Sequence, residues 1–134
     1  MKKNLPIIGL ILFSSAFFMP ALVGYPEPVS GWACLRDCAP AFDMNHNPLL
    51  ALYYFAFVFT NGLFVIAAIR LVVSARRSVA LRWIAGVLLM HVLSWCIWNL
   101  VDIGDFRLRY GYFVWLSAYA VLFAATFLLS ESDA

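Results

Sequence analysis

The sequence predicts an all-α membrane protein built as a bundle of four antiparallel transmembrane helices. Of its 134 residues, 65% are hydrophobic and only 12% are charged, whereas soluble domains are about half apolar and a quarter charged. Four stretches lack Asp, Glu, Lys and Arg: residues 4–26, 44–69, 83–101 and 110–130. Each supplies the roughly 20 residues with which a helix crosses about 30 Å of hydrocarbon. This composition excludes a soluble enzyme, a nucleic-acid binder and a disordered regulator.

We expect a single domain, residues 1–134, with spans at residues 5–24, 48–70, 82–102 and 110–130. Lys2 and Lys3 before the first apolar run would also suit a secretory signal, but the length of the run and Pro20 favour an uncleaved helix. Asn47 and Pro48 are typical of a helix start, and Ser78 can cap the third helix. The short link after residue 101 predicts that the last two helices form a hairpin.

The distribution of Lys and Arg predicts the orientation, because cytoplasmic loops of membrane proteins carry the excess of these residues. Six of them fall on one side of the predicted membrane and three on the other. The first group is Lys2, Lys3, Arg70, Arg76, Arg77 and Arg82, and the second is Arg36, Arg107 and Arg109. Both termini are therefore expected in the cytoplasm. The 25–47 loop then faces the periplasm, if the protein lies in a bacterial inner membrane as its compactness suggests.

Two cysteines, Cys34 and Cys38, lie in this outward loop. An oxidising compartment would allow them to pair, and one helical turn places their Cα atoms about 6 Å apart, within the range of a disulfide. We expect a small disulfide that shapes the loop. Pairing with a partner protein and redox chemistry are the alternatives.

Four spans with a dithiol in the first outward loop resemble the quinone-linked disulfide-bond oxidases. That resemblance implies redox chemistry with a quinone as cofactor. The sequence departs from those proteins in two respects. Its cysteines have three intervening residues rather than two, and it has no second periplasmic pair, since Cys96 falls inside the third span.

Two strongly polar residues, Asn61 and His91, fall inside predicted spans, where such residues are functional candidates. With a rise of about 1.5 Å per residue, both lie near the middle of the membrane. A hydrogen bond between them is therefore feasible. It would serve either as a structural contact between two helices or as part of a ligand, proton or quinone site. His46 lies too far from His91 for the two to share a metal ion, so no metal site is expected.

A stripe of functional side chains follows one face of the third span: His91, Trp95, Trp98 and Asp102. The spacing of these residues keeps them within about 60° around the helix, so we expect the stripe to face the bundle. Tyr54 shares a face with Asn61 on the preceding span. Together these residues predict an aromatic-walled pocket that opens outward, although tryptophans near the end of a span also form interfacial belts.

Aromatic residues gather toward the outward end of the predicted bundle. Those at or near this end are Trp32, Trp95, Trp98, Trp115, Tyr25, Tyr53, Tyr54, Tyr110 and Tyr112. If these aromatic residues only anchored the protein in the membrane, both ends of the bundle would carry comparable numbers of them. The surplus therefore indicates a binding surface, to which Arg107, Arg109 and Trp115 belong, because Trp, Tyr and Arg are frequent anchors at interfaces.

The fourth span opens with Tyr-Gly-Tyr-Phe-Val-Trp-Leu-Ser, residues 110–117, and continues with alanines at 118, 120, 124 and 125. This opening is similar to that of uncharacterised small four-span bacterial inner-membrane proteins. Small residues at such spacing allow helices to pack closely. The resemblance implies a bacterial inner membrane and no activity.

The predicted function is therefore that of a non-enzymatic binding protein, since no catalytic triad, phosphate loop or pair of carboxylates is present. Its partner would be a membrane or periplasmic protein, bound in or beside the bilayer, and not a nucleic acid. In size and span count the chain resembles small immunity proteins that neutralise membrane-targeting toxins. An accessory subunit of a membrane complex, or a thiol-redox protein that uses Cys34, Cys38 and the His91 stripe, are the alternatives.

Overall fold

A computed structural model describes residues 4–23, 27–38, 48–74, 78–101 and 107–128. Three long helices dominate it: α4 (Pro48–Ser74), α5 (Val79–Leu100) and α6 (Tyr110–Leu128). A shorter helix, α1 (Leu5–Ala16), precedes them, and α2 (Gly31–Cys38) lies between α1 and α4. The all-α prediction is confirmed, and the long helices begin and end within a few residues of three predicted spans.

The three long helices are apolar and long enough to cross a membrane. Their outer faces remain hydrophobic, as α4 illustrates. Phe59, Ile66 and Val73 follow one another at intervals of seven residues, nearly two helical turns, and are 60%, 63% and 79% exposed. A continuous apolar stripe of this kind, on a helix long enough to cross a bilayer, is typical of a surface that faces lipid. The chain is therefore a membrane protein.

The first helix is shorter than predicted. It ends at Ala16 rather than near residue 24, and the chain continues through a turn into strand β1 (Pro20–Leu22). Pro20 explains the early end, because a proline disfavours helical geometry in the residue before it and cannot donate to the helix. At 12 residues, α1 is about 18 Å long, less than the hydrocarbon thickness of a bilayer.

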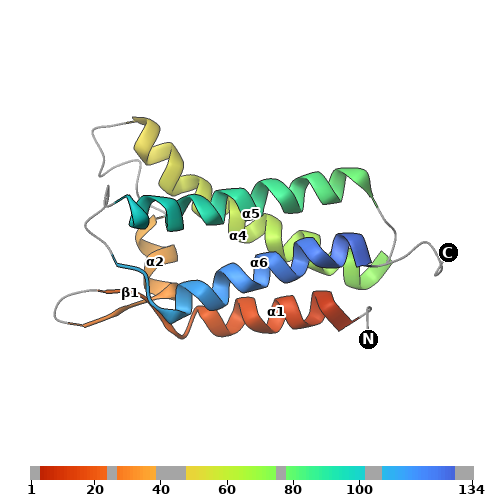
Figure 1. Ribbon diagram of the computed structural model, residues 1–134, viewed down its shortest axis with the longest axis horizontal. Helices are drawn as coiled ribbons and strands as arrows, with labels where there is room; N and C mark the ends of the chain where they lie inside the picture. Colours follow the sequence, from red (N-terminus) through yellow and green to blue (C-terminus); the bar gives the residue numbers. More distant parts are fainter. Residues whose placement is uncertain (1–3, 24–26, 39–47, 75–77, 102–106, 129–134) are drawn as a thin grey trace.

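Figure 1 shows α5, α6 and α1 side by side in one layer, with α4 crossing behind them at an angle. The antiparallel pair α1 and α6 packs most closely, because small residues face each other there. A Cβ atom on Gly9 would lie 3.6 Å from the carbonyl oxygen of Ala118, which is itself fully buried. Where α1, α4 and α6 meet, the ring of Phe64 stacks on Phe13 at 4.4 Å and lies 4.6 Å from the ring of Tyr119.

A small cap closes one end of the bundle. We define the cap as β1, β2 (Val29–Ser30), α2 and residues 107–109. Strands β1 and β2 pair antiparallel, with Pro20 opposite Ser30. On the other side of β1, the Arg109 amide donates to the Ala21 carbonyl at 2.8 Å. Of the region predicted as the 25–47 loop, residues 29–38 are thus strand and helix.

Glycines allow the cap to approach the bundle closely. A Cβ atom on Gly31 would lie 2.6 Å from the Ala16 carbonyl oxygen, and one on Gly111 would lie 2.7 Å from the Pro20 carbonyl oxygen. Both distances are shorter than van der Waals contact with backbone atoms. The first residues of α2 also donate to the turn that follows α1, from the Gly31 amide to the Met19 carbonyl at 3.1 Å and from the Trp32 amide to the Phe17 carbonyl at 3.0 Å. The cap therefore packs directly against the cap-side ends of α1 and α6.

Candidate functional site

A cavity of about 410 Å³ lies between the cap and the cap-side ends of the helices. Every described helix and both strands contribute to its wall. The lining residues are Ala16, Phe17, Ala21, Leu22, Val29, Gly31, Cys34, Asp37, Cys38, Tyr54, Phe57, Trp95, Leu108, Gly111, Tyr112 and Trp115. The wall is mostly aliphatic and aromatic, which is typical of pockets for hydrophobic ligands.

Three of the predicted site residues meet at this cavity: Tyr54 from α4, Trp95 from α5 and Trp115 from α6. Sequence reasoning missed Phe57, which lies nearly one turn after Tyr54 on the same helix and whose ring is 4.9 Å from that of Trp115. The three-residue spacing from Tyr54 was the available signal. It also missed Leu22 and Leu108, whose placement depends on the pairing of β1 with residues 107–109.

The indole of Trp115 is fixed by Asn61, which lies deeper in the bundle. The Trp115 Nε1 atom donates to Asn61 Oδ1 at 2.9 Å, and the Asn61 Nδ2 atom donates to the Phe57 carbonyl at 2.7 Å. The Tyr119 hydroxyl donates to the Thr60 carbonyl at 3.2 Å and lies 3.5 Å from Asn61 Oδ1. These bonds use the polar groups of Asn61 within the protein, as a structural contact between helices requires.

The hydrogen bond that the sequence made feasible between Asn61 and His91 is not formed. Asn61 faces α6, because α4 crosses behind the other helices, and His91 instead lies beside Tyr53, with ring centroids 5.1 Å apart. Among the described residues, the buried His91 Nε2 atom has no hydrogen-bond partner. His91 is not part of the cavity wall.

Tyr53 organises an aromatic cluster between α4 and α5. Its ring stacks on Trp98 at 4.7 Å and on Trp95 at 5.4 Å. The Ser94 hydroxyl donates to the His91 carbonyl at 2.6 Å, so the Tyr53 hydroxyl must supply the proton of its 2.5 Å contact with Ser94. The predicted stripe of His91, Trp95 and Trp98 therefore faces the bundle. Its fourth member, Asp102, lies outside the described residues.

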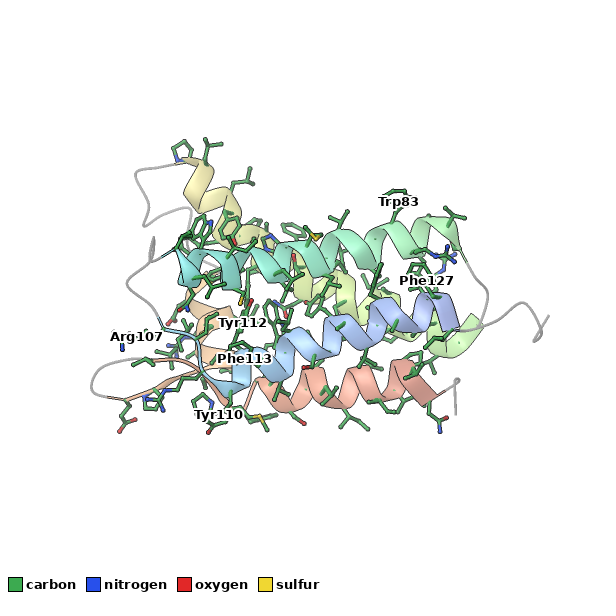
Figure 2. All side chains as sticks on the ribbon, viewed as in Figure 1. Trp83, Arg107, Tyr110, Tyr112, Phe113 and Phe127 are labelled. Atoms are coloured by element: carbon green, nitrogen blue, oxygen red, sulfur yellow. The ribbon has the colours of Figure 1, made fainter. Side chains whose placement is uncertain are left out.

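Arg107 and Arg109 are exposed at the cap, and their side chains do not line the cavity. Their backbone groups hold the cap together: the Arg107 carbonyl accepts a hydrogen bond from the Val23 amide at 2.8 Å. Figure 2 shows Arg107 and Tyr110 at the cap end and Trp83 and Phe127 at the opposite end. There the Arg82 guanidinium lies 4.2 Å from the centre of the Phe127 ring.

Cys34 and Cys38 both line the cavity from α2, but as free thiols, so the predicted disulfide is not formed. Residues four apart on a helix have Cβ atoms about 5–6 Å apart, whereas a disulfide requires about 3.8 Å. Closing the bond would therefore require α2 to unwind. The Cα atoms of the two cysteines are separated by a distance that suits a disulfide, but their Cβ atoms are too far apart.

Burial raises the pKa of the Cys34 thiol to about 12, with smaller contributions from Cys38 and Asp37. Burial and the Asp37 charge raise the pKa of Cys38 to about 11. Both groups are therefore neutral thiols at pH 7 and weak nucleophiles. Within the described residues, no three His, Cys, Asp or Glu side chains gather as a metal site would require.

Searches for related proteins found no match for this chain among protein families, curated proteins or solved structures.

Proposed function

We propose that this chain is a binding protein of a bacterial inner membrane, which recognises a partner at its cap end and catalyses no reaction. The cavity carries this proposal. The cap and the helices α1, α4, α5 and α6 all contribute to its wall, which is mostly hydrophobic. Such a wall suits a hydrophobic group that a ligand or partner inserts.

The proposal places four passes in the membrane, with both termini in the cytoplasm. In Figure 1 the start of α1 and the end of α6 lie at the end opposite the cap. Arg70 and Arg82 belong to that end and Arg36 to the cap, in keeping with the excess of Lys and Arg on the cytoplasmic side. Although α1 is short, a bilayer can thin locally around a short span.

The chemistry of the wall favours binding over catalysis. A nucleophile needs a lowered pKa or an adjacent base, whereas the pKa of both cavity thiols is raised. Asp37, the carboxylate among the described lining residues, accepts a hydrogen bond from the Arg36 Nε atom at 2.9 Å. The partner can be a protein, as for an immunity protein or a subunit of a complex, or a small hydrophobic molecule.

Thiol-redox chemistry is the second candidate, because Cys34 and Cys38 both line the cavity. Oxidation of the two thiols to a disulfide would release two electrons and two protons to an acceptor such as a quinone. The helical spacing of the cysteines and their raised pKa values oppose this step. His91, which the sequence associated with the same chemistry, lies outside the cavity wall. We therefore favour binding.

Photo-crosslinking in intact membranes tests the binding proposal. A diazirine-bearing amino acid replaces Leu22 in the cavity wall in one variant and Val87 on the exposed face of α5 in a matched control. We expect the Leu22 variant to yield adducts, with a protein or a small molecule, that disappear when Cys34→Phe fills the cavity. The Val87 variant should yield lipid adducts that Cys34→Phe leaves unchanged. Leu22 adducts that are absent, or that persist unchanged with Cys34→Phe, would contradict the proposal.

A further inference from the structure

We infer that the cavity accommodates one alkyl chain of an outer-leaflet lipid, whose polar headgroup remains outside the cavity mouth. This inference rests on the proposed function and names the hydrophobic group that the cap end binds.

The wall surrounds a ligand with rings and aliphatic side chains. Phe17, Leu22 and Leu108 lie on the cap side, and Phe57, Trp95 and Trp115 lie on the bundle side. A chain that leaves the bilayer for this wall gains no hydrophobic free energy, because lipid tails are equally apolar. Its binding depends instead on van der Waals contact between the chain and the wall along the length of the chain. The wall atoms lack these contacts when the cavity is empty.

Two polar groups of the wall already form hydrogen bonds within the protein. Trp115 Nε1 donates to Asn61, and the Tyr112 hydroxyl donates to the Val92 carbonyl at 2.6 Å. The Cys34 and Cys38 thiols act as small hydrophobic groups. An alkyl chain needs no hydrogen bond from this wall, so both of these internal bonds remain intact when it binds.

The cavity reaches the surface beside Asp37. This residue lines the cavity, yet its side chain is 61% exposed and is paired with the Arg36 side chain, which is 69% exposed. A lipid headgroup can therefore remain at the cap surface, beside this ion pair, while its chain extends inward.

The volume matches one chain rather than a whole lipid. A methylene group occupies about the same space as a water molecule in the liquid, about 30 Å³. A cavity of 410 Å³ therefore holds about fourteen methylene groups.

The experiment uses the full chain in vesicles that contain a trace of phosphatidylcholine with a diazirine near the end of one acyl chain. After irradiation, the adducts are mapped to peptides. We expect adducts at the cavity residues Tyr54 and Trp95 in addition to those at the exposed Val87. Cys34→Phe, which fills the cavity from α2, should reduce the cavity adducts by about tenfold, because overpacking of this size is costly. Cys38→Phe repeats the test from a second position.

Leu35→Phe is the matched control, because Leu35 lies on the same helix but does not line the cavity. It should preserve both sets of adducts, and unchanged Val87 adducts report an intact bundle in every variant. Cavity adducts that are absent from the wild type, or that persist in both cavity-filling variants, would overturn the inference. If the Leu22 photo-probe meanwhile captures a discrete protein, binding at the cap stands and only the lipid chain is rejected. If neither probe yields a specific adduct, both proposals fail.

Discussion

The indole N–H of Trp115 donates a hydrogen bond to the side-chain oxygen of Asn61, 2.9 Å away, and both residues are buried. This contact joins α6 to α4 directly beneath the cavity, of which Trp115 forms part of the wall. A polar residue near the middle of a span thus sets the orientation of an aromatic ring at the candidate site.

Replacing Asn61 by leucine should lower the free energy of unfolding by about 1–2 kcal/mol, because the buried Trp115 N–H loses its acceptor. Denaturation in detergent, followed by circular dichroism, measures the change. Combining Asn61→Leu with Trp115→Phe should cost less than the sum of the two single changes, since the donor is then removed as well. Strictly additive costs would show that the two residues are not coupled.

Alanine at Gly31 or Gly111 should destabilise the protein by about 1–3 kcal/mol, as overpacking does. The new methyl group would meet a backbone carbonyl at 2.6 Å or 2.7 Å, which cannot move as a side chain can. Gly62→Ala is the matched control, because no atom lies within 4 Å of its added Cβ. It should stabilise α4 by up to about 1 kcal/mol through helix propensity. Equal effects at all three glycines would contradict the close approach of the cap.

Leucine in place of His91 should leave stability within about 1 kcal/mol of the wild type or raise it, because a buried nitrogen without a partner is removed. Tyr53→Ala serves as the contrast. It removes a ring that stacks on Trp98 and Trp95 and should cost about 2 kcal/mol or more. A loss from His91→Leu as large as that from Tyr53→Ala would reveal an essential contact of the imidazole.

Stability should decline in alkaline solution because of the cavity thiols. Burial raises the pKa of Cys34 from 9.0 to about 12 and that of Cys38 from 9.0 to about 11. The folded protein therefore favours the neutral thiols. Their contribution to the free energy of unfolding is fully present below pH 9. It is lost as the pH rises through the folded-state values, because the unfolded chain ionises first. Thermal melts of the wild type and of the Cys34→Ser/Cys38→Ser variant between pH 8 and pH 11 measure it. The same alkaline decline in both proteins would exclude the thiols as its cause.

The long helices could be predicted from sequence because charged residues are absent from them over about 20 positions. Even so, α4 continues to Ser74, beyond the predicted end at residue 70. A charged side chain such as Arg70 need not end a helix, since its long aliphatic stem can reach the membrane surface. Pro20 was a local signal for the early end of α1. The prediction instead followed the apolar composition of residues 5–24.

The candidate site could be predicted only in part. Helical periodicity correctly grouped His91, Trp95 and Trp98 on one face, but periodicity does not show which neighbour a face meets. Because α4 crosses behind the bundle, Asn61 forms its hydrogen bond with Trp115 rather than with His91. The cap had no local signal, because strands of two and three residues form only through pairing with distant backbone.

Native mass spectrometry of the full chain released from its own membranes tests the central claim most directly, since it weighs whatever the cavity holds. We predict that the wild type and Leu35→Phe each carry one bound hydrophobic molecule, and that Cys34→Phe is released without it. Identical bare masses for the three proteins, or the same bound molecule on all three, would contradict the claim that the cavity beneath the cap is the binding site.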